Sequence, residues 1–351
     1  MGYTVLKDIA SLTPSVHSLN PRQAGCFLPG NVGDEGKSKF YPYLILHIPC
    51  LYVIKKEKHH NHVSPRKEEY NKVYIIQMDT KELTRQAEVD RRRLIEVVYN
   101  AKAGHIGGDL SCLNVMTALY FKYLNVDPKD PKNPDRDRFV LSKGHCVEAL
   151  YTTLEAKGFL KKEITDTLGK YGSILSGHPT IEVPGIEVNT GALGHGLSIG
   201  VGMALAAKMD KKGYKTFVMM GDGEQGEGSI YEAAMAGHQY KLDNLVAIID
   251  RNHLQISGNT EDVMALESIK ERWTAFGWDV KMMNGDDMED IVKTFDSIDY
   301  TNNKPHMIVS NTTKGKGVSY MENVAKWHHG MPDEAQYKQA LQEIDERIKN
   351  L

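Results

Sequence analysis

The chain has 351 residues, of which 41% are hydrophobic and 25% charged. This is the composition of a globular protein of one or two domains, and it excludes disordered and fibrous classes. With 43 Lys and Arg against 46 Asp and Glu the net charge is −3, so no positive field is available to hold a nucleic acid. Four widely spaced cysteines form neither a disulfide framework nor a zinc motif, and no apolar run approaches the roughly 20 residues that cross a bilayer. We expect a cytoplasmic protein with no nucleic-acid or membrane partner.

The first 77 residues differ from the rest of the chain. They carry ten Lys or Arg against six Asp or Glu, contain six prolines, and show no sustained helical or strand period. They also lack the charged start, apolar centre and cleavage site of a secretory signal. We expect residues 1–77 to be an atypical leader, disordered or not native, with natural synthesis beginning at Met78 and residues 78–351 forming the folded domain.

Helical and strand patterns alternate from residue 78 on. The first predicted elements are helices over 79–103 and 113–123, a strand over 138–141 and a helix over 148–157. A βαβ rhythm follows, with helix 197–208, strand 216–220, helix 229–240, strand 245–249, helix 266–276, strand 279–282, a helix from 288, strand 306–310 and a C-terminal helix. The alternation predicts an α/β fold, a mostly parallel sheet with helices on both faces, that binds ligands beyond the carboxyl ends of its strands.

A glycine-rich turn, Gly221-Asp222-Gly223-Glu224-Gln225-Gly226, follows the predicted strand 216–220 and precedes a helix. It matches GxGxxG, so a dinucleotide-binding module is one interpretation, with Asp250 as the acid after the next strand. Asp222, however, would face the negative diphosphate. Two anions about 4 Å apart repel by several kcal/mol at an intermediate dielectric, so a cation must lie between them.

Magnesium meets this requirement, because it binds oxygen ligands from a few protein groups together with phosphates and water. Asp222 offers a carboxylate, and the turn after strand 245–249 brings the amide of Asn252 to the same edge of the sheet. The backbone carbonyl of Leu254 offers a third oxygen. Either turn alone is as often an ordinary surface feature, but the two together at adjacent strand ends predict a metal site with Asp222, Asn252 and Leu254 as ligands.

Five of the fourteen histidines directly follow a glycine. Gly-His favours loops, where this architecture places its chemistry, and imidazole exchanges protons near neutral pH. His238 lies inside a predicted helix and is interpreted as a surface residue. The remaining candidates are His105, His145, His178 and His195, together with the pair His328-His329.

GDG followed about thirty residues later by Asn resembles the fingerprint of thiamine diphosphate enzymes. The segments AGHIGG (103–108), LSKGH (141–145), SGHP (176–179) and TGALGHG (190–196) resemble transketolase motifs in order and spacing. The resemblance runs from about Met78 to Pro332, and a full transketolase continues beyond that point into a pyrimidine-binding domain. The chain is therefore similar to the N-terminal subunit of a split transketolase, which implies the diphosphate-binding (PP) domain of the thiamine diphosphate fold.

This resemblance implies roles for the motif residues. Four histidines would line the substrate channel and move protons as catalytic residues: His105, His145, His178 and His329, the last preferred to His328 because His-Gly-x-Pro matches better. The implied cofactor-binding residues are Gly191, Leu193, His195, Gly221, Asp222, Gly223, Glu224 and Asn252, with His195 replacing the glutamine of full-length enzymes. Glu227 matches an acid at the subunit interface that couples paired sites.

The implied activity is transfer of a two-carbon ketol unit from a ketose phosphate to an aldose, dependent on thiamine diphosphate and Mg²⁺, in the pentose phosphate route or a specialised sugar pathway. The activating glutamate and the phosphate-gripping arginines of the family belong to the half that this chain lacks. We therefore expect an inactive single subunit that pairs with a C-terminal transketolase subunit, two copies of each.

Three alternatives remain open at this point. The α subunit of a 2-oxo acid dehydrogenase and a deoxyxylulose phosphate synthase-like fragment share the GDG…Asn site. The order of the four histidines favours transketolase over both, because hydroxyl-rich substrates need more hydrogen-bonding partners than pyruvate does. The third alternative is a non-catalytic NAD- or phosphate-binding module.

Overall fold

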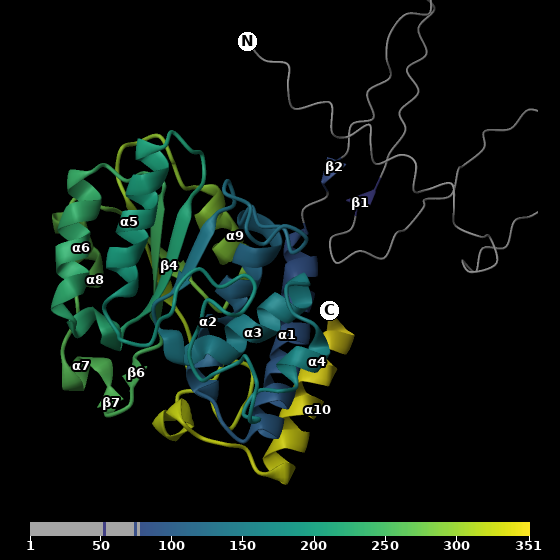
Figure 1. Ribbon diagram of the computed structural model, residues 1–351. Coiled ribbons are helices and arrows are strands. Elements are labelled where there is room, and N and C mark those ends of the chain that lie inside the picture. Colours follow the sequence, from purple (N-terminus) through teal and green to yellow (C-terminus); the bar gives the residue numbers. More distant parts are fainter. Residues whose placement is uncertain (1–51, 54–73, 76–77) are drawn as a thin grey trace, which may run out of the picture. The chain divides into compact units, whose positions relative to one another are not determined.

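The computed structural model describes residues 52–53, 74–75 and 78–351. Tyr52–Val53 (β1) and Tyr74–Ile75 (β2) pair antiparallel. The predictions of a disordered or non-native leader over residues 1–77 and of a natural start at Met78 otherwise lie outside the described residues and stay predictions. Residues 78–351 form the sheet and the helices that position the candidate site (Figure 1).

A parallel sheet of five strands, in the order β3-β4-β5-β9-β8, forms the centre of this part of the chain. The strands are β3 (Arg138–Leu141), β4 (Thr216–Gly221), β5 (Leu245–Arg251), β8 (Asp279–Asn284) and β9 (His306–Asn311). Strands β4 and β5 are buried almost throughout, as expected for a parallel sheet covered on both faces. The prediction of an α/β fold with a mostly parallel sheet is confirmed.

Helices cover both faces of the sheet (Figure 1). The core on one face contains α1 (Thr80–Ala101), α2 (Ile106–Ala118), α3 (Val147–Lys157) and α9 (Met288–Asp296), with α10 (Glu334–Asn350) packed against α1. The core on the other face contains α5 (Gly196–Met209), α6 (Gly228–Gln239) and α8 (Ile269–Ala275). Phe217 and Met219 of β4 join the first core, whereas Val218 joins the second. This follows from the strand period, which sends successive side chains to opposite faces.

The boundaries of two helices show where local sequence and tertiary packing agree and where they differ. Helix α1 begins as predicted, at a capping box in which Asp79 and Glu82 satisfy each other's backbone N–H groups. Helix α2 begins at Ile106, earlier than the predicted start at residue 113, because glycines in AGHIGG make that stretch resemble a loop. Every residue of α2 is buried, so its packing outweighs the low helix propensity of glycine.

Several short elements near the carboxyl ends of the strands were not predicted. Strand β5 leads into the hairpin β6 (Leu254–Gln255) and β7 (Gly258–Asn259) and then into α7 (Thr260–Val263), which lie together at one end of the sheet (Figure 1). Elsewhere, the unpredicted elements are α4 (Lys162–Thr165) and the 3-10 turns Gly144–Cys146, Gly223–Gly226 and Ala325–His328, whereas the π-helical turn Leu119–Tyr123 lies within the predicted helix 113–123. Across the described residues, every helix is too short or too polar to cross a bilayer.

Candidate functional site

The ends of β4 and β5 bring the two predicted metal-binding turns together. The parallel register places Gly221 beside Asp250, so Asp222 and Asn252 both follow the same edge of the sheet. The backbone N–H of His253 donates to Asp222 Oδ2 at 2.8 Å, which ties the second turn directly to the first. Both predicted ligand side chains are buried.

Asp222 is held in one orientation. Its Oδ2 also accepts hydrogen bonds from Arg251 Nη1 at 3.0 Å and Thr260 Oγ1 at 3.2 Å. Its Oδ1 accepts one from the backbone N–H of Gly223 at 2.7 Å. Because a carboxylate oxygen has two lone pairs, Oδ1 keeps the capacity to bind a further partner. Arg251 is itself shared with the carboxylates of Glu261 and Glu267.

Asp250 orients the side chain of Asn252. The amide Nδ2 of Asn252 donates to Asp250 Oδ2 at 3.0 Å and to Ser111 Oγ at 3.3 Å, so the amide oxygen points the other way, where it accepts from the N–H of Leu254 at 3.1 Å. Asp250 is buried and forms an ion pair with the buried Lys143. It is thus already engaged and does not have the free carboxylate that the dinucleotide interpretation requires.

The donor set of this corner fits magnesium. Asp222, Asn252 and the carbonyl of Leu254 contribute a carboxylate, an amide and a backbone oxygen, which are the hard ligands that Mg²⁺ binds. In the part of the chain that the structure describes, no three His, Cys, Asp or Glu side chains converge as a metal cluster. The histidines described below therefore do not form a chelating set.

A buried lysine adjoins the same corner. Lys314, in the turn after β9, donates from Nζ to the carbonyl of Leu254 at 3.0 Å and lies 2.7 Å from His328 Nδ1. Burial, together with the charge of Lys143, lowers its pKa to about 8. Among the described residues it has no carboxylate partner within ion-pair distance, and an uncompensated buried ammonium is costly. A bound diphosphate would supply the missing negative charge.

Sequence reasoning missed Lys314, because the two lysines of TTKGKG match no motif with a known spacing. The only available signal was its place after the predicted strand 306–310. A cation at the carboxyl end of a third central strand is well placed for an anionic ligand.

All four histidines predicted to be catalytic lie in one cluster centred on His105. The ring centroid of His105 lies 4.4 Å from that of His329, 5.3 Å from His145 and 6.3 Å from His178. His328 belongs to the same cluster, 5.8 Å from His105. Both His328 and His329 therefore lie in the histidine cluster.

Burial keeps several of these rings neutral. It lowers the pKa of His105 to about 4, with the neighbouring His145 as the next cause, and that of His328 to about 3, with Lys314 as the next cause. Burial also lowers the pKa of His178. A neutral imidazole both donates and accepts, which suits hydrogen bonding to hydroxyl groups. The Nδ1 atom of His105 is buried and has no partner in the described structure, so it is available to a ligand.

The segment over residues 190–196 packs between this cluster and the glycine-rich turn. Gly191 has a φ of +146°, and a Cβ there would lie 3.0 Å from the His178 ring, so only glycine lets that ring approach. Glu224 is buried and accepts from the N–H groups of Gly194 and Gly221, each at 2.9 Å, and from the Ser142 hydroxyl. It joins three loops, and its predicted contact with a cofactor stays a prediction.

The other predicted residues lie at the surface around these loops. Gly221 and Gly223 flank Asp222, and Gly223 faces Gln255 of β6. Leu193, His195 and Glu227 are exposed, and His195 makes none of the ring contacts of the histidine cluster. Their predicted roles in cofactor binding and in coupling of paired sites stay predictions.

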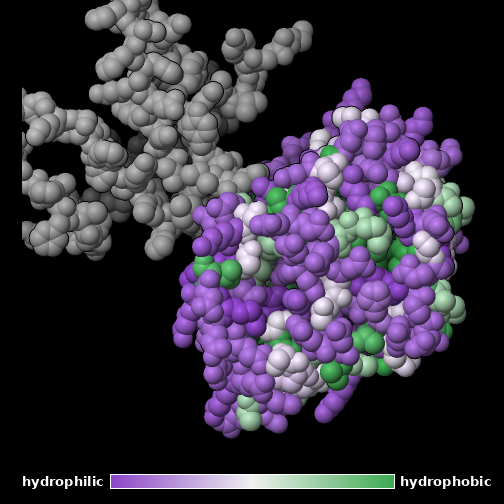
Figure 2. Space-filling model, turned by 180° about the vertical axis from the view of Figure 1, so that it is seen from behind, coloured by the Kyte–Doolittle hydropathy of each residue, from purple (hydrophilic) through white to green (hydrophobic). Residues whose placement is uncertain are grey.

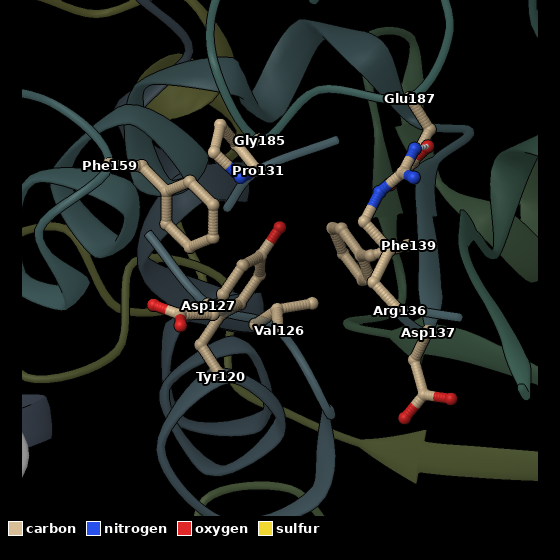
Figure 3. A pocket seen from close by; sticks show the side chains of 10 residues that line it. All are labelled: Tyr120, Val126, Asp127, Pro131, Arg136, Asp137, Phe139, Phe159, Gly185 and Glu187. Carbon is tan, nitrogen blue, oxygen red and sulfur yellow. Dashed lines mark hydrogen bonds and ion pairs between the residues drawn. The ribbon is translucent and has the colours of Figure 1, made fainter. Parts of the chain in front are cut away.

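A small cavity elsewhere does not compete with this site. It lies at the amino end of β3, where Tyr120 points between Phe139 and Phe159 (Figure 3). Its volume of about 10 Å³ holds roughly one water molecule, too little for a sugar. The candidate site is the corner formed by Asp222, Asn252, Lys314 and the histidine cluster, because buried charged groups and the unpartnered His105 Nδ1 converge there.

Comparisons with known proteins identify the family of the chain. The family described as "Transketolase, thiamine diphosphate binding domain" matches residues 84–344. The chain is 74% identical over 276 residues to an apulose-4-phosphate transketolase subunit of Phocaeicola vulgatus, covering 79% of this chain and 98% of that protein. It is 41% identical over 265 residues to the 6-deoxy-6-sulfo-D-fructose transketolase subunit SqwG of a Clostridium species, covering 75% and 96%.

Among solved structures, the transketolase of Campylobacter jejuni superposes with a TM-score of 0.73 and 33% sequence identity. The match covers 76% of this chain but only 43% of that enzyme, whereas the separate subunits are matched over almost their whole length. The interpretation of the chain as the N-terminal subunit of a split transketolase is confirmed. The chain belongs to the transketolase family, as a subunit that carries the thiamine diphosphate-binding domain.

Proposed function

We propose that this subunit holds Mg²⁺ and the diphosphate of thiamine diphosphate for ketol transfer from a ketose phosphate to an aldose. The metal would be bound by Asp222, Asn252 and the carbonyl of Leu254. The ammonium group of Lys314 would balance part of the negative charge of the diphosphate. The observation that carries the proposal is the convergence of this oxygen corner and the five-histidine cluster on one buried lysine, Lys314. When bound, thiamine diphosphate supplies the nucleophile and the electron sink for cleavage of the ketose.

The histidines then have distinct tasks in this proposal. His105, His145, His178 and His329 orient the hydroxyl groups of donor and acceptor and pass protons between them, since imidazole rings at these spacings can act as general acids and bases. His328 bonds to Lys314 and so positions the ammonium group beside the diphosphate.

Removal of a metal ligand tests the cofactor site. We expect Asp222→Ala and Asn252→Ala to weaken thiamine diphosphate binding by at least about 100-fold in the complex with the C-terminal subunit, because the bridge between carboxylate and phosphate is lost. Calorimetry with and without EDTA measures this loss. The matched control is Asp262→Ala, an exposed carboxylate on α7 without a partner in the described structure. Unchanged affinity in both ligand variants would refute the proposal.

The sugar specificity is proposed from the names of the relatives. Apulose 4-phosphate is the first donor to test, because two subunits that are 74% and 44% identical to this chain carry that substrate in their names. Xylulose 5-phosphate represents the pentose phosphate route, and pyruvate represents the 2-oxo acid alternative. Release of carbon dioxide from pyruvate, without ketol transfer from either sugar, would favour the α subunit of a 2-oxo acid dehydrogenase or a synthase-like fragment. Metal-independent binding of NAD in a thermal-shift screen would favour the binding module.

Self-association through α5 and α6 is also proposed, giving two copies of each subunit. Helix α5 contains a single charged residue, Lys208, although its outward side is uncovered. Met209 of α5 is 74% exposed and Met235 of α6 is 56% exposed. A different face of the molecule is mostly hydrophilic, with only scattered hydrophobic patches (Figure 2). Glu227, at the start of α6 and against Gly194, lies beside the proposed interface, which suits a role in coupling paired sites.

A cytoplasmic location belongs to the same proposal. Cys112 and Cys146 are free thiols, which is the expected state in a reducing compartment.

A further inference from the structure

Two buried carboxyl groups lie behind the histidine cluster. Asp109 is on α2, four positions after His105, and Glu148 is on α3, three positions after His145. Both are at most 2% exposed. Neither forms an ion pair in the described part of the chain, and neither has been assigned a role above.

The contacts of the two carboxyl groups leave one oxygen atom of each without a hydrogen-bond donor. Asp109 Oδ1 accepts from the backbone N–H of Ala149 at 2.9 Å. The carboxyl group of Glu148 lies against the other Gly-His loop, where a Cβ added at Gly104 would come within 3.3 Å of Glu148 Cδ. Asp109 Oδ2 and Glu148 Oε2 are then buried with no donor among the described residues, although the two carboxyl groups are within hydrogen-bonding contact.

Two carboxylates offer four acceptors and no donor, so a hydrogen bond between them requires a proton on one of them. Burial explains why the pair of carboxyl groups retains this proton at neutral pH. Burial raises the pKa of Glu148 to about 8 and raises the pKa of Asp109 well above its usual range, with the neighbouring Glu148 as the next cause. The other ionisable groups near the pair are Cys112, Cys146, Tyr151 and Lys143, and Lys143 is already paired with Asp250. The nearby residue from α1, Val98, is apolar.

We propose that Asp109 and Glu148 share one proton and that this pair positions His105 in the cluster. The shared proton joins the start of α2 to the start of α3, and the backbone N–H of Asp109 donates to the carbonyl of His105 at 3.1 Å. Loss of the proton leaves two negative charges in a buried gap, and their repulsion separates the two Gly-His loops. Asp109 and Glu148 are positioning residues, and their role in ketol transfer rests on the function proposed above for His105.

The sign of the pH effect follows from linkage. The folded pair keeps a proton that the unfolded chain releases above about pH 4.5. The pair therefore contributes its full stability below that pH, and this contribution is lost as the pH rises to about 8. Glu148→Gln replaces the shared proton by an amide donor, which can bond to Asp109 Oδ2 at every pH.

The test compares the full wild-type chain with Glu148→Gln and, as a matched control on an exposed site, Glu163→Gln. Melting temperatures are measured between pH 5 and pH 9. Histidine-selective NMR follows the His105 ring, assigned from the signal missing in His105→Gln. We expect the wild type and the control to lose stability relative to Glu148→Gln as the pH rises to about 8. We also expect the wild-type His105 signal to shift with a midpoint near pH 8 and this shift to vanish in Glu148→Gln.

An unchanged shift and an unchanged slope in Glu148→Gln would overturn the proposal. Lys314 titrates in the same range, but its contribution persists in the variant and so cannot imitate the expected loss. If Glu148→Gln does not fold, Asp109→Asn is measured instead, with the same expected and contrary outcomes. Neither the melting temperature nor the NMR signal depends on turnover. The shared proton can therefore be refuted or supported whether or not the protein catalyses the proposed ketol transfer.

Discussion

At the scale of single residues, the site depends on buried polar groups that fix one another. The amide of Asn252 is held in one orientation because Asp250 accepts from its nitrogen, and Asp250 in turn forms a buried ion pair with Lys143. Such a hydrogen-bond network is stable as long as every member is present, because removal of one partner leaves another polar group buried and without a partner. The residues behind the predicted ligands therefore matter as much as the ligands.

Asp250→Ala tests this dependence. We expect a loss of about 3–5 kcal/mol in the free energy of unfolding, because Lys143 is left as an uncompensated buried charge. Asp135→Ala, which removes an exposed ion pair with Lys212, is the matched control and should cost at most about 1 kcal/mol. Urea denaturation measures both. Equal losses in the two variants would contradict the role assigned to Asp250.

At the scale of elements, the helices differ in how completely the described chain covers them. Helix α2 is buried along its whole length, as an apolar helix should be. Helix α5 is similarly apolar, but it leaves Gly202 and Met209 exposed, and a Cβ added at Gly202 would meet no atom within 4 Å. An apolar helix with one uncovered side indicates a missing partner.

Gly202→Glu tests the proposed interface on α5. We expect the variant to remain folded, since glutamate has a higher helix propensity than glycine, but to shift from dimer to monomer because a charge enters an apolar contact. Light scattering after size-exclusion chromatography gives the mass. Gly213→Glu, at another exposed glycine with open space, is the control and should keep the wild-type mass. A dimer in both variants would place the interface elsewhere.

At the scale of the whole molecule, two properties follow from how much of a transketolase the chain represents. It matches 43% of the solved Campylobacter enzyme, and relatives that it matches over almost their whole length are named as subunits. We expect no ketol transfer from this chain alone and full transfer after addition of its C-terminal partner, assayed with apulose 4-phosphate and an aldose acceptor. Turnover by the purified single chain would contradict this expectation.

The domain boundary at Met78 can be tested in the same assay. Helix α1 begins with its own capping box at Asp79, and Met78 packs against the core, so residues 78–351 contain the elements that a folded domain needs. We expect a chain that starts at Met78 to match the full chain in melting temperature and in activity with the partner. A lower melting temperature would show that earlier residues contribute to the fold.

The sequence alone determined the α/β class, the order of the strands along the chain, and most of the candidate site. These depend on local signals: apolar periodicity, glycines at strand ends, and motifs that bring Asp222, Asn252 and the Gly-His loops to one edge. The start of α2 was predicted too late, and the hairpin after β5 was not predicted, because tertiary packing rather than local propensity stabilises them.

Only the tertiary structure identified Lys314, Asp250 and the pair Asp109–Glu148 as parts of the site. The importance of each depends on which charge lies next to it in a buried environment. These neighbours come from segments far apart in the sequence, and spacing along the chain carries no information about such contacts. The same applies to His328, which is only a second histidine in the sequence but is bonded to a buried lysine in the fold.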